Sequence, residues 1–170
     1  MKLVDSKNKT IPGPEIITRV IHNMSEEELD GISPDVALIG MAKELTMEDV
    51  EPKQFGNTVF IGHYTDDKSG VYMRAINMDT AKNFVDNGEQ YIKYLLDQGV
   101  DKMYSEFNGP QLLHVFKLFS KRPGTKDMIF NYFKIDEDTN GVEVIIDPSK
   151  ASKPIQPLSS GVEDLQNEPL

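Results

Sequence analysis

The sequence lacks several residue types and segments on which large classes of proteins depend. It contains no cysteine, which excludes disulfides, thiolate metal sites and cysteine nucleophiles. No apolar run approaches the roughly 20 residues needed to cross a bilayer, and residues 1–13 lack the apolar core of a signal peptide. We therefore expect an intracellular, soluble protein with no membrane partner.

Positive charge is also scarce. Eighteen Lys and Arg residues stand against 28 Asp and Glu residues, a formal net charge of −10. Most of the excess lies in residues 26–51, where nine acidic residues accompany Lys43 alone. Such a field disfavours the phosphate backbones of nucleic acids. It can attract a basic protein partner, including another copy of this chain, or it can simply keep a helix face solvated.

The residues that are present fit one domain. A chain of 170 residues, 38% of them hydrophobic, can bury roughly 70% of the surface that its unfolded form exposes. We divide it into an N-terminal arm (1–13), an α/β domain (14–147) and an extended tail (148–170). The tail is rich in proline and serine with isolated apolar residues, so it forms no core of its own. We interpret it as a linker or a partner-docking segment.

Capping signals predict that the first fifty residues are mainly helical. Pro14 opens the helical pattern PEIITRVIHNM, and Ser25 with Glu28 matches a capping box. Ser33 is placed to cap a further helix that has Pro34 at its first position.

Beyond this region the pattern changes from helical to strand-like. Residues 57–64 (NTVFIGHY) and 69–78 (SGVYMRAINM) are rich in β-branched and aromatic residues, and the polar TDDK between them indicates a hairpin. From Thr80 the helical period returns, with Asp79 as the expected N-cap and Gly99 as the C-terminal stop.

The rest of the domain alternates in the same way. Residues 101–107 are strand-like, and residues 108–124 predict a helix with Asn108 as its cap. Residues 126–135 and 141–147 predict two more strands around the polar DEDTN. The order is helices, then β, β, α, β, α, β, β, which is typical of an α/β fold on a mixed sheet.

This order over residues 25–146 resembles that of the GCN5-related N-acetyltransferase (GNAT) fold, and in particular the reduced members encoded by tailed bacteriophages. The resemblance implies a mixed, mostly antiparallel sheet flanked by helices. The resemblance implies one of two functions: N-acyl transfer from acetyl-CoA, or a binding role in the virion or its assembly. The residues at the family's functional positions distinguish between them.

In the family, a turn of the form Arg/Gln-x-x-Gly-x-Gly/Ala gives bare backbone amides to the pyrophosphate of coenzyme A. The matching positions here are residues 74–79 (RAINMD), so the resemblance makes Arg74, Asn77, Met78, Asp79 and Thr80 the candidate cofactor contacts. The small residues are replaced, the second by an acid. A capping carboxylate at Asp79 would occupy the helix amides that a diphosphate needs, and we take this as evidence against cofactor binding.

The family also carries a tyrosine that protonates the leaving thiolate, in the helix after its fifth strand. Val115 and Phe116 occupy that region here. His114 and Glu106 are the candidates for proton transfer in its place. A surface or hydrogen-bonded role is the alternative for His114.

Residues 136–147 partly match a calcium-binding loop. Asp136, Asp138, Asn140 and Asp147 fall at loop positions 1, 3, 5 and 12. Position 12 is not the usual glutamate, and alternating valines follow Asn140-Gly141, a pair typical of hairpin turns. We therefore favour a turn there and expect no metal.

Taken together, these patterns lead us to predict a non-catalytic, GNAT-like structural or binding protein, such as a phage virion or assembly component, that needs no cofactor. Its partners would be other proteins or copies of itself, contacted through residues 26–51 and 148–170. The alternative is an N-acyltransferase that uses acetyl-CoA through a degenerate pyrophosphate loop.

Overall fold

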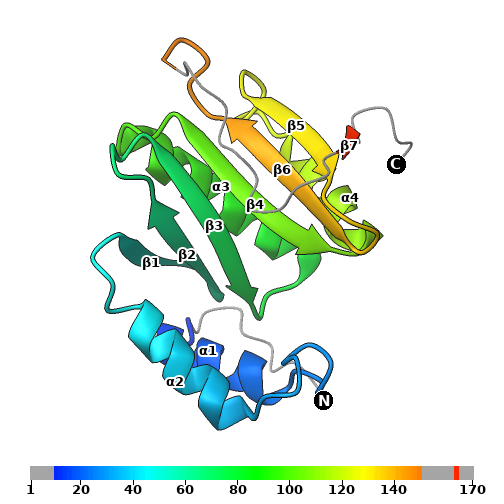
Figure 1. The fold of residues 1–170 in the computed structure, drawn as a ribbon. Coiled ribbons are helices and arrows are strands. Elements are labelled where there is room, and N and C mark those ends of the chain that lie inside the picture. Colours follow the sequence, from blue (N-terminus) through cyan, green and yellow to red (C-terminus); the bar gives the residue numbers. More distant parts are fainter. Residues whose placement is uncertain (1–9, 151–162, 165–170) are drawn as a thin grey trace.

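The strands form one mixed sheet that is antiparallel except at its centre. In a computed structural model, which describes residues 10–150 and 163–164, the strand order is β1-β2-β3-β4-β6-β5-β7 (Figure 1). Within the described residues, β3 and β4 are the only strands that pair in parallel. The predicted GNAT-like architecture is confirmed. The strands are β1 (Val50–Phe55), β2 (Thr58–Tyr64), β3 (Gly70–Asn77), β4 (Lys102–Asn108), β5 (Ile129–Lys134), β6 (Thr139–Ile145) and β7 (Glu163–Asp164).

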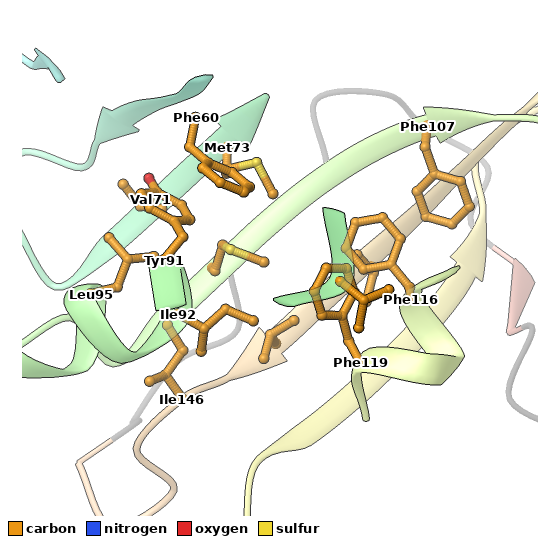
Figure 2. Packing of buried hydrophobic residues seen from close by; sticks show 14 of the residues in the cluster. Phe60, Val71, Met73, Tyr91, Ile92, Leu95, Phe107, Phe116, Phe119 and Ile146 are labelled. Carbon is orange, nitrogen blue, oxygen red and sulfur yellow. The ribbon is translucent and has the colours of Figure 1, made fainter. Parts of the chain in front are cut away.

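Two helices cover the face of the sheet that is turned away from the viewer in Figure 1. They are α3 (Ala81–Asp97) and α4 (Pro110–Phe119). Figure 2 shows Phe116 of α4 beside Phe107 of β4, and the centroids of these two rings lie 5.0 Å apart. Phe119 packs against Phe116, with ring centroids 5.7 Å apart. The buried residues of this cluster, including Tyr91 and Leu95 of α3, form the larger core.

Gly88 sets how closely these two helices approach. A Cβ atom at Gly88 would lie 2.1 Å from the Phe119 ring. Because only a glycine fits under that ring, α3 and α4 pack in direct contact at this point.

The other two helices form a second, smaller core against β1, β2 and β3. The helix α1 (Gly13–His22) lies on the sheet and α2 (Pro34–Glu44) packs beside it (Figure 1). The predicted caps are confirmed: Ser33 Oγ accepts from the Val36 amide at 3.2 Å, and Ser25 and Glu28 exchange capping-box hydrogen bonds. Residues 25–31 nevertheless form turns, because Asp30 and Gly31 adopt positive φ angles that end a helix.

Sequence reasoning missed β1. Its residues VEPKQF are mostly polar and contain Pro52, which is compatible with a strand only at a sheet edge. β1 is that edge, and it joins β2 through a two-residue turn at Gly56 and Asn57. Gly56 has a φ of +54°, and its Cβ would lie 2.8 Å from the Asn87 side chain, so both conformation and space require glycine.

Two predicted helix caps are wrong. Thr80, not Asp79, is the N-cap of α3, and its hydroxyl accepts from the Asn83 amide at 3.3 Å. Gly109, not Asn108, precedes α4 and provides no side-chain cap. The predicted stop at Gly99, with a φ of +82°, is confirmed.

Part of the predicted tail lies on the domain. Glu163 and Asp164 form β7, which pairs antiparallel with Lys134 and Phe133 of β5. At the other end of the chain, Ile11 from the predicted arm exchanges hydrogen bonds with Asn57 and Gln54. The remaining tail residues, 151–162 and 165–170, lie outside the described part of the chain, as do residues 1–9.

Candidate active site

The centre of the sheet opens into a splay. β3 and β4 pair only from Gly70 to Tyr72 and from Lys102 to Tyr104. β3 then continues to Asn77 along β2, whereas β4 continues to Asn108 along β6. The two strands therefore diverge over their second halves.

The divergence leaves backbone groups of β3 facing the splay. In the antiparallel ladder with β2, Thr65 bonds to Gly70 and Met78 bonds to Asn57, so alternate residues between them complete that ladder. Met73 and Ala75 lie in the intervening positions. The Met73 N–H group still belongs to the last pair of the parallel ladder, Tyr72 with Tyr104, whereas Ala75 directs its N–H and C=O groups toward β4 after that strand has moved away. Among the described strands, none pairs with Ala75 on this side, so its backbone donor and acceptor line the splay.

A cavity of about 660 Å³ lies on the α3/α4 side of the splay; we call it the donor-side cavity. β3 contributes Ala75 and Asn77 and α3 contributes Ala81. The other lining residues are Phe84, Pro110, Leu112, His114 and Val115. Its wall is mainly apolar, and the first turn of α3 stands at its mouth.

The first turn of α3 offers free donors. Thr80 caps the Asn83 amide, and no side chain in the described part of the chain caps those of Ala81 and Lys82. Backbone N–H groups at the positive end of a helix, here one of 17 residues, are suited to binding phosphate groups.

Cations continue this anion-friendly surface. A second cavity, of about 420 Å³, shares Ala81 with the first and is lined by Lys82, Lys121 and Arg122 together with Val85 and Leu118. Arg122 also pairs with Asp86 at 2.7 Å. In a chain of net charge −10, this local group of three cations marks the side of the molecule suited to a polyanion.

Asp79 does not compete for these amides. Its carboxylate accepts from the Asn57 amide and from the Asn87 side chain, both at 2.7 Å. Asn87 in turn donates to Thr58 at 3.0 Å. Asp79 therefore ties the strand–helix junction to the β1–β2 turn and points away from the first turn of α3.

The opposite side of the splay holds a smaller cavity of about 350 Å³; we call it the acceptor-side cavity. Met73 and Ser105, which follow the last paired residues of β3 and β4, lie at its base. The side chains around them are Glu44, His63, Tyr72, Arg74, Tyr104 and Glu106. Of the acids in this set, Glu106 is exposed and accepts from the Tyr104 hydroxyl at 2.9 Å.

The negative charge of Glu44 is paired with two neighbouring side chains. Its carboxylate contacts His63 Nε2 at 2.6 Å and the Arg74 guanidinium at 2.5 Å. Partial burial raises the pKa of Glu44, but the hydrogen bond from His63 and the charge of Arg74 outweigh burial, and the net pKa is lowered. Arg74 therefore lies on the acceptor side, away from Asn77 and Thr80.

The structure thus separates the two candidates for proton transfer. His114 lines the donor-side cavity with Asn77, and Glu106 lines the acceptor-side cavity. One of the two candidates therefore lies on each side of the splay.

The partial calcium pattern does not converge. Asp136 accepts from the amides of Asp138 and Thr139 at 2.9 and 2.8 Å, so it forms the β5–β6 turn itself. Asn140 lies within β6, and Asp147 lies beyond the far end of that strand. The predicted turn at Asn140-Gly141 is wrong, because Gly141 instead makes room for the Phe133 ring, 2.4 Å from where its Cβ would be. No cluster of three or more potential ligand side chains occurs among the described residues.

Several of these lining residues were missed from the sequence. Glu44, His63, Tyr72 and Tyr104 come from α2, β2, β3 and β4, and no linear spacing relates them. Lys121 and Arg122 are far from Lys82 in sequence, and they line one cavity with it because α3 and α4 are in contact.

Comparisons with known proteins support the fold. No protein-family model and no curated protein matches the sequence. Among solved structures, it is similar to a chimera of the spermidine N-acetyltransferase SpeG of Vibrio cholerae with hSSAT: 9% identity, TM-score 0.57, 81% of this chain and 93% of that chain. It is also similar to a point mutant of SpeG: 12% identity, TM-score 0.51, 81% and 94% of the two chains.

These likenesses and the splayed central strands define the class of architecture as GNAT-like. Both similar structures are of acetyltransferases. No helix in the described part of the chain has the length and hydropathy that crossing a membrane requires.

Proposed function

We propose that the protein is an N-acyltransferase that takes an acyl group from acetyl-CoA in the donor-side cavity and passes it through the splay to an amine. The observation that carries this proposal is the splay itself. A cavity lies on either side of it, and Ala75, beyond the last pair of the parallel ladder, directs its N–H group into the opening between them.

The donor side matches the chemistry of coenzyme A. An apolar cavity of about 660 Å³ suits the pantetheine arm. The free amides of Ala81 and Lys82 suit the pyrophosphate, and the cations of Lys82, Lys121 and Arg122 suit its remaining phosphate. A β3 amide that points into the splay is placed to hydrogen-bond the thioester carbonyl, where negative charge develops during attack.

Each step of the transfer has a group near it. The neutral amine attacks the thioester carbonyl carbon, the C–S bond breaks, and an amide and a thiolate result. Glu106 on the acceptor side accepts the proton that the amine loses, and His114 on the donor side donates a proton to the thiolate.

The acceptor side favours a cationic substrate. Glu44 is paired with Arg74 and His63, whereas Glu106 is exposed and faces the cavity beside two tyrosine rings. A carboxylate next to aromatic faces attracts an ammonium group before it is deprotonated. The similar structures are of spermidine N-acetyltransferases, which is consistent with an amine acceptor.

This proposal replaces the non-catalytic reading that the sequence favoured. That prediction rested on the replaced small residues, on the missing tyrosine and on Asp79 occupying the helix amides, and Asp79 binds Asn57 and Asn87 instead. A role in a phage virion or its assembly stays a prediction.

Calorimetry with acetyl-CoA, followed by an assay for free thiol release with a panel of amines, tests the proposal. We expect saturable binding and amine-dependent thiol release. Absence of both, with the protein folded by circular dichroism, would restore the non-catalytic reading. Acetyl-CoA hydrolysis without amine dependence would contradict the acceptor assignment.

A further inference from the structure

The outer surface of α2 carries an apolar stripe that nothing in the described part of the chain covers. Ile32, Val36, Ile39 and Met47 are 48%, 53%, 57% and 51% exposed. Val36 and Ile39, three residues apart, lie on one side of α2, and Ile32 and Met47 lie in the segments that flank its two ends. Scattered exposed apolar residues are normal, but a contiguous stripe on one helix marks an interaction surface.

A glycine in the middle of this stripe has no role within the subunit. Gly40 lies inside α2, where glycine is less favourable than alanine. Its φ is not positive, and a Cβ there would meet nothing within 4 Å. Neither conformation nor internal packing therefore requires glycine. A bare helix backbone does, however, let a second helix approach closely.

We propose that α2 is the contact surface of a two-fold symmetric homodimer in which the α2 helices of two copies pack antiparallel. An axis midway between Ile39 and Gly40 places Ile39 of each copy over Gly40 of the other. The same axis brings Ile32 beside Met47 of the other copy. The stripe is thus complementary to itself, as a two-fold interface requires.

Charges at the two ends of the helix fit the same arrangement. Asp35 lies in the first turn of α2 and Lys43 in the last, and both are exposed. In the antiparallel pair, Lys43 of one copy lies next to Val36 of the other and within reach of its neighbour Asp35. Opposed helix dipoles favour this orientation as well.

The acidic residues around the stripe predict how the dimer responds to salt. Residues 26–51 carry nine acids against Lys43, so two copies repel each other over distances that salt screens. Added salt should therefore strengthen the dimer. A basic helix of another protein on the same stripe would respond in the opposite way.

Sedimentation velocity on the full chain, at low and high salt, tests the proposal. We expect a dimer whose dissociation constant falls when salt is added. Ile39→Asp should raise that constant by about tenfold or more, as for a central interface residue. Gly40→Leu should do so too while keeping the circular dichroism spectrum and the thermal midpoint, because its side chain meets open space in the single subunit.

A charge exchange makes the orientation falsifiable. Asp35→Lys and Lys43→Asp should each weaken the dimer, and the double variant should restore it; failure to restore overturns the antiparallel register. A protein that stays monomeric up to about 0.1 mM overturns the dimer. A second result would also overturn the dimer. It is that the wild-type protein is a monomer and binds a model Leu/Lys helical peptide, whereas the Ile39→Asp variant does not bind that peptide.

Discussion

The two sides of the splay differ in what surrounds the same pair of strands. On the donor side, bare amides and the cations Lys82, Lys121 and Arg122 border an apolar cavity. On the acceptor side, Glu106 and the Glu44 ion pairs border a smaller, polar one. The two faces of one sheet therefore differ in the charge of the side chains around the splay.

This difference follows from a two-residue period. Along β3, Arg74 and Ala75 point to opposite faces, so neighbouring residues in sequence line opposite cavities. In the reaction we propose, the two substrates would meet through the opening between β3 and β4. Electrostatic separation of the two cavities is a physical reason why each would bind its own ligand.

Removing the acid of the acceptor side should have the largest effect. Glu106→Gln should lower kcat by about 100- to 10,000-fold, since it removes the proton acceptor, with acetyl-CoA affinity unchanged by calorimetry. Glu137→Gln, an exposed acid in the β5–β6 turn, is the matched control. Equal loss of acetyl-CoA binding in Glu106→Gln would place that residue on the donor side and break the comparison.

Removing the hydrogen bonds of Asp79, which join the start of α3 to the β1–β2 turn, should mainly lower the free energy of unfolding. Asp79→Ala leaves the Asn57 amide and the Asn87 side chain without their acceptor, so the free energy of unfolding should fall by about 1–3 kcal/mol in urea titrations. If Asp79 blocked the cofactor amides, the substitution would instead raise acetyl-CoA affinity markedly. Thr80→Ala, which removes the observed cap, should cost about 1 kcal/mol.

Reversing one cation should affect the donor side alone. Lys121→Glu should weaken acetyl-CoA binding by about tenfold, and the amine KM should stay the same. Lys126→Glu makes the same charge change at an exposed position outside the cavity and should leave both constants unchanged. Identical effects from the two variants would show that only the general field matters.

The smallest expected effect is the pH dependence of the Glu44 ion pairs. The pKa of Glu44 is lowered in the folded protein from its ordinary 4.5. The stability that it contributes is therefore present above pH 4.5 and is lost as the pH falls through the folded-state pKa. The difference in unfolding free energy between wild type and Glu44→Gln should shrink over that fall.

Periodic patterns predicted the elements whose apolar faces are continuous. The β2–β3 hairpin and α3 were recognised because Phe60, Tyr91 and Leu95 repeat at the intervals of their elements and are buried. β1 was missed because an edge strand tolerates Pro52 and polar neighbours. β7 was missed because two residues carry no period.

Side-chain directions at the candidate site could not be predicted in the same way. Asp79 has the chemistry of a helix cap, and only the position of Asn57 and Asn87 across the junction explains why it turns elsewhere. Arg74 was assigned to a phosphate and meets Glu44, which is 30 residues earlier in the sequence. Contacts between elements decided both residues.

Gly88 also affects the dimensions of the donor-side cavity. Because the Phe119 ring lies where a Cβ atom of Gly88 would be, the close contact of α3 with α4 sets the width of the donor-side cavity between these helices. A larger residue at position 88 would have to push Phe119 and its helix outward, and the cations of Lys121 and Arg122 would move with that helix. In a set of related chains, a glycine at this position should therefore identify those that keep the same width of cavity, even where every lining residue has changed.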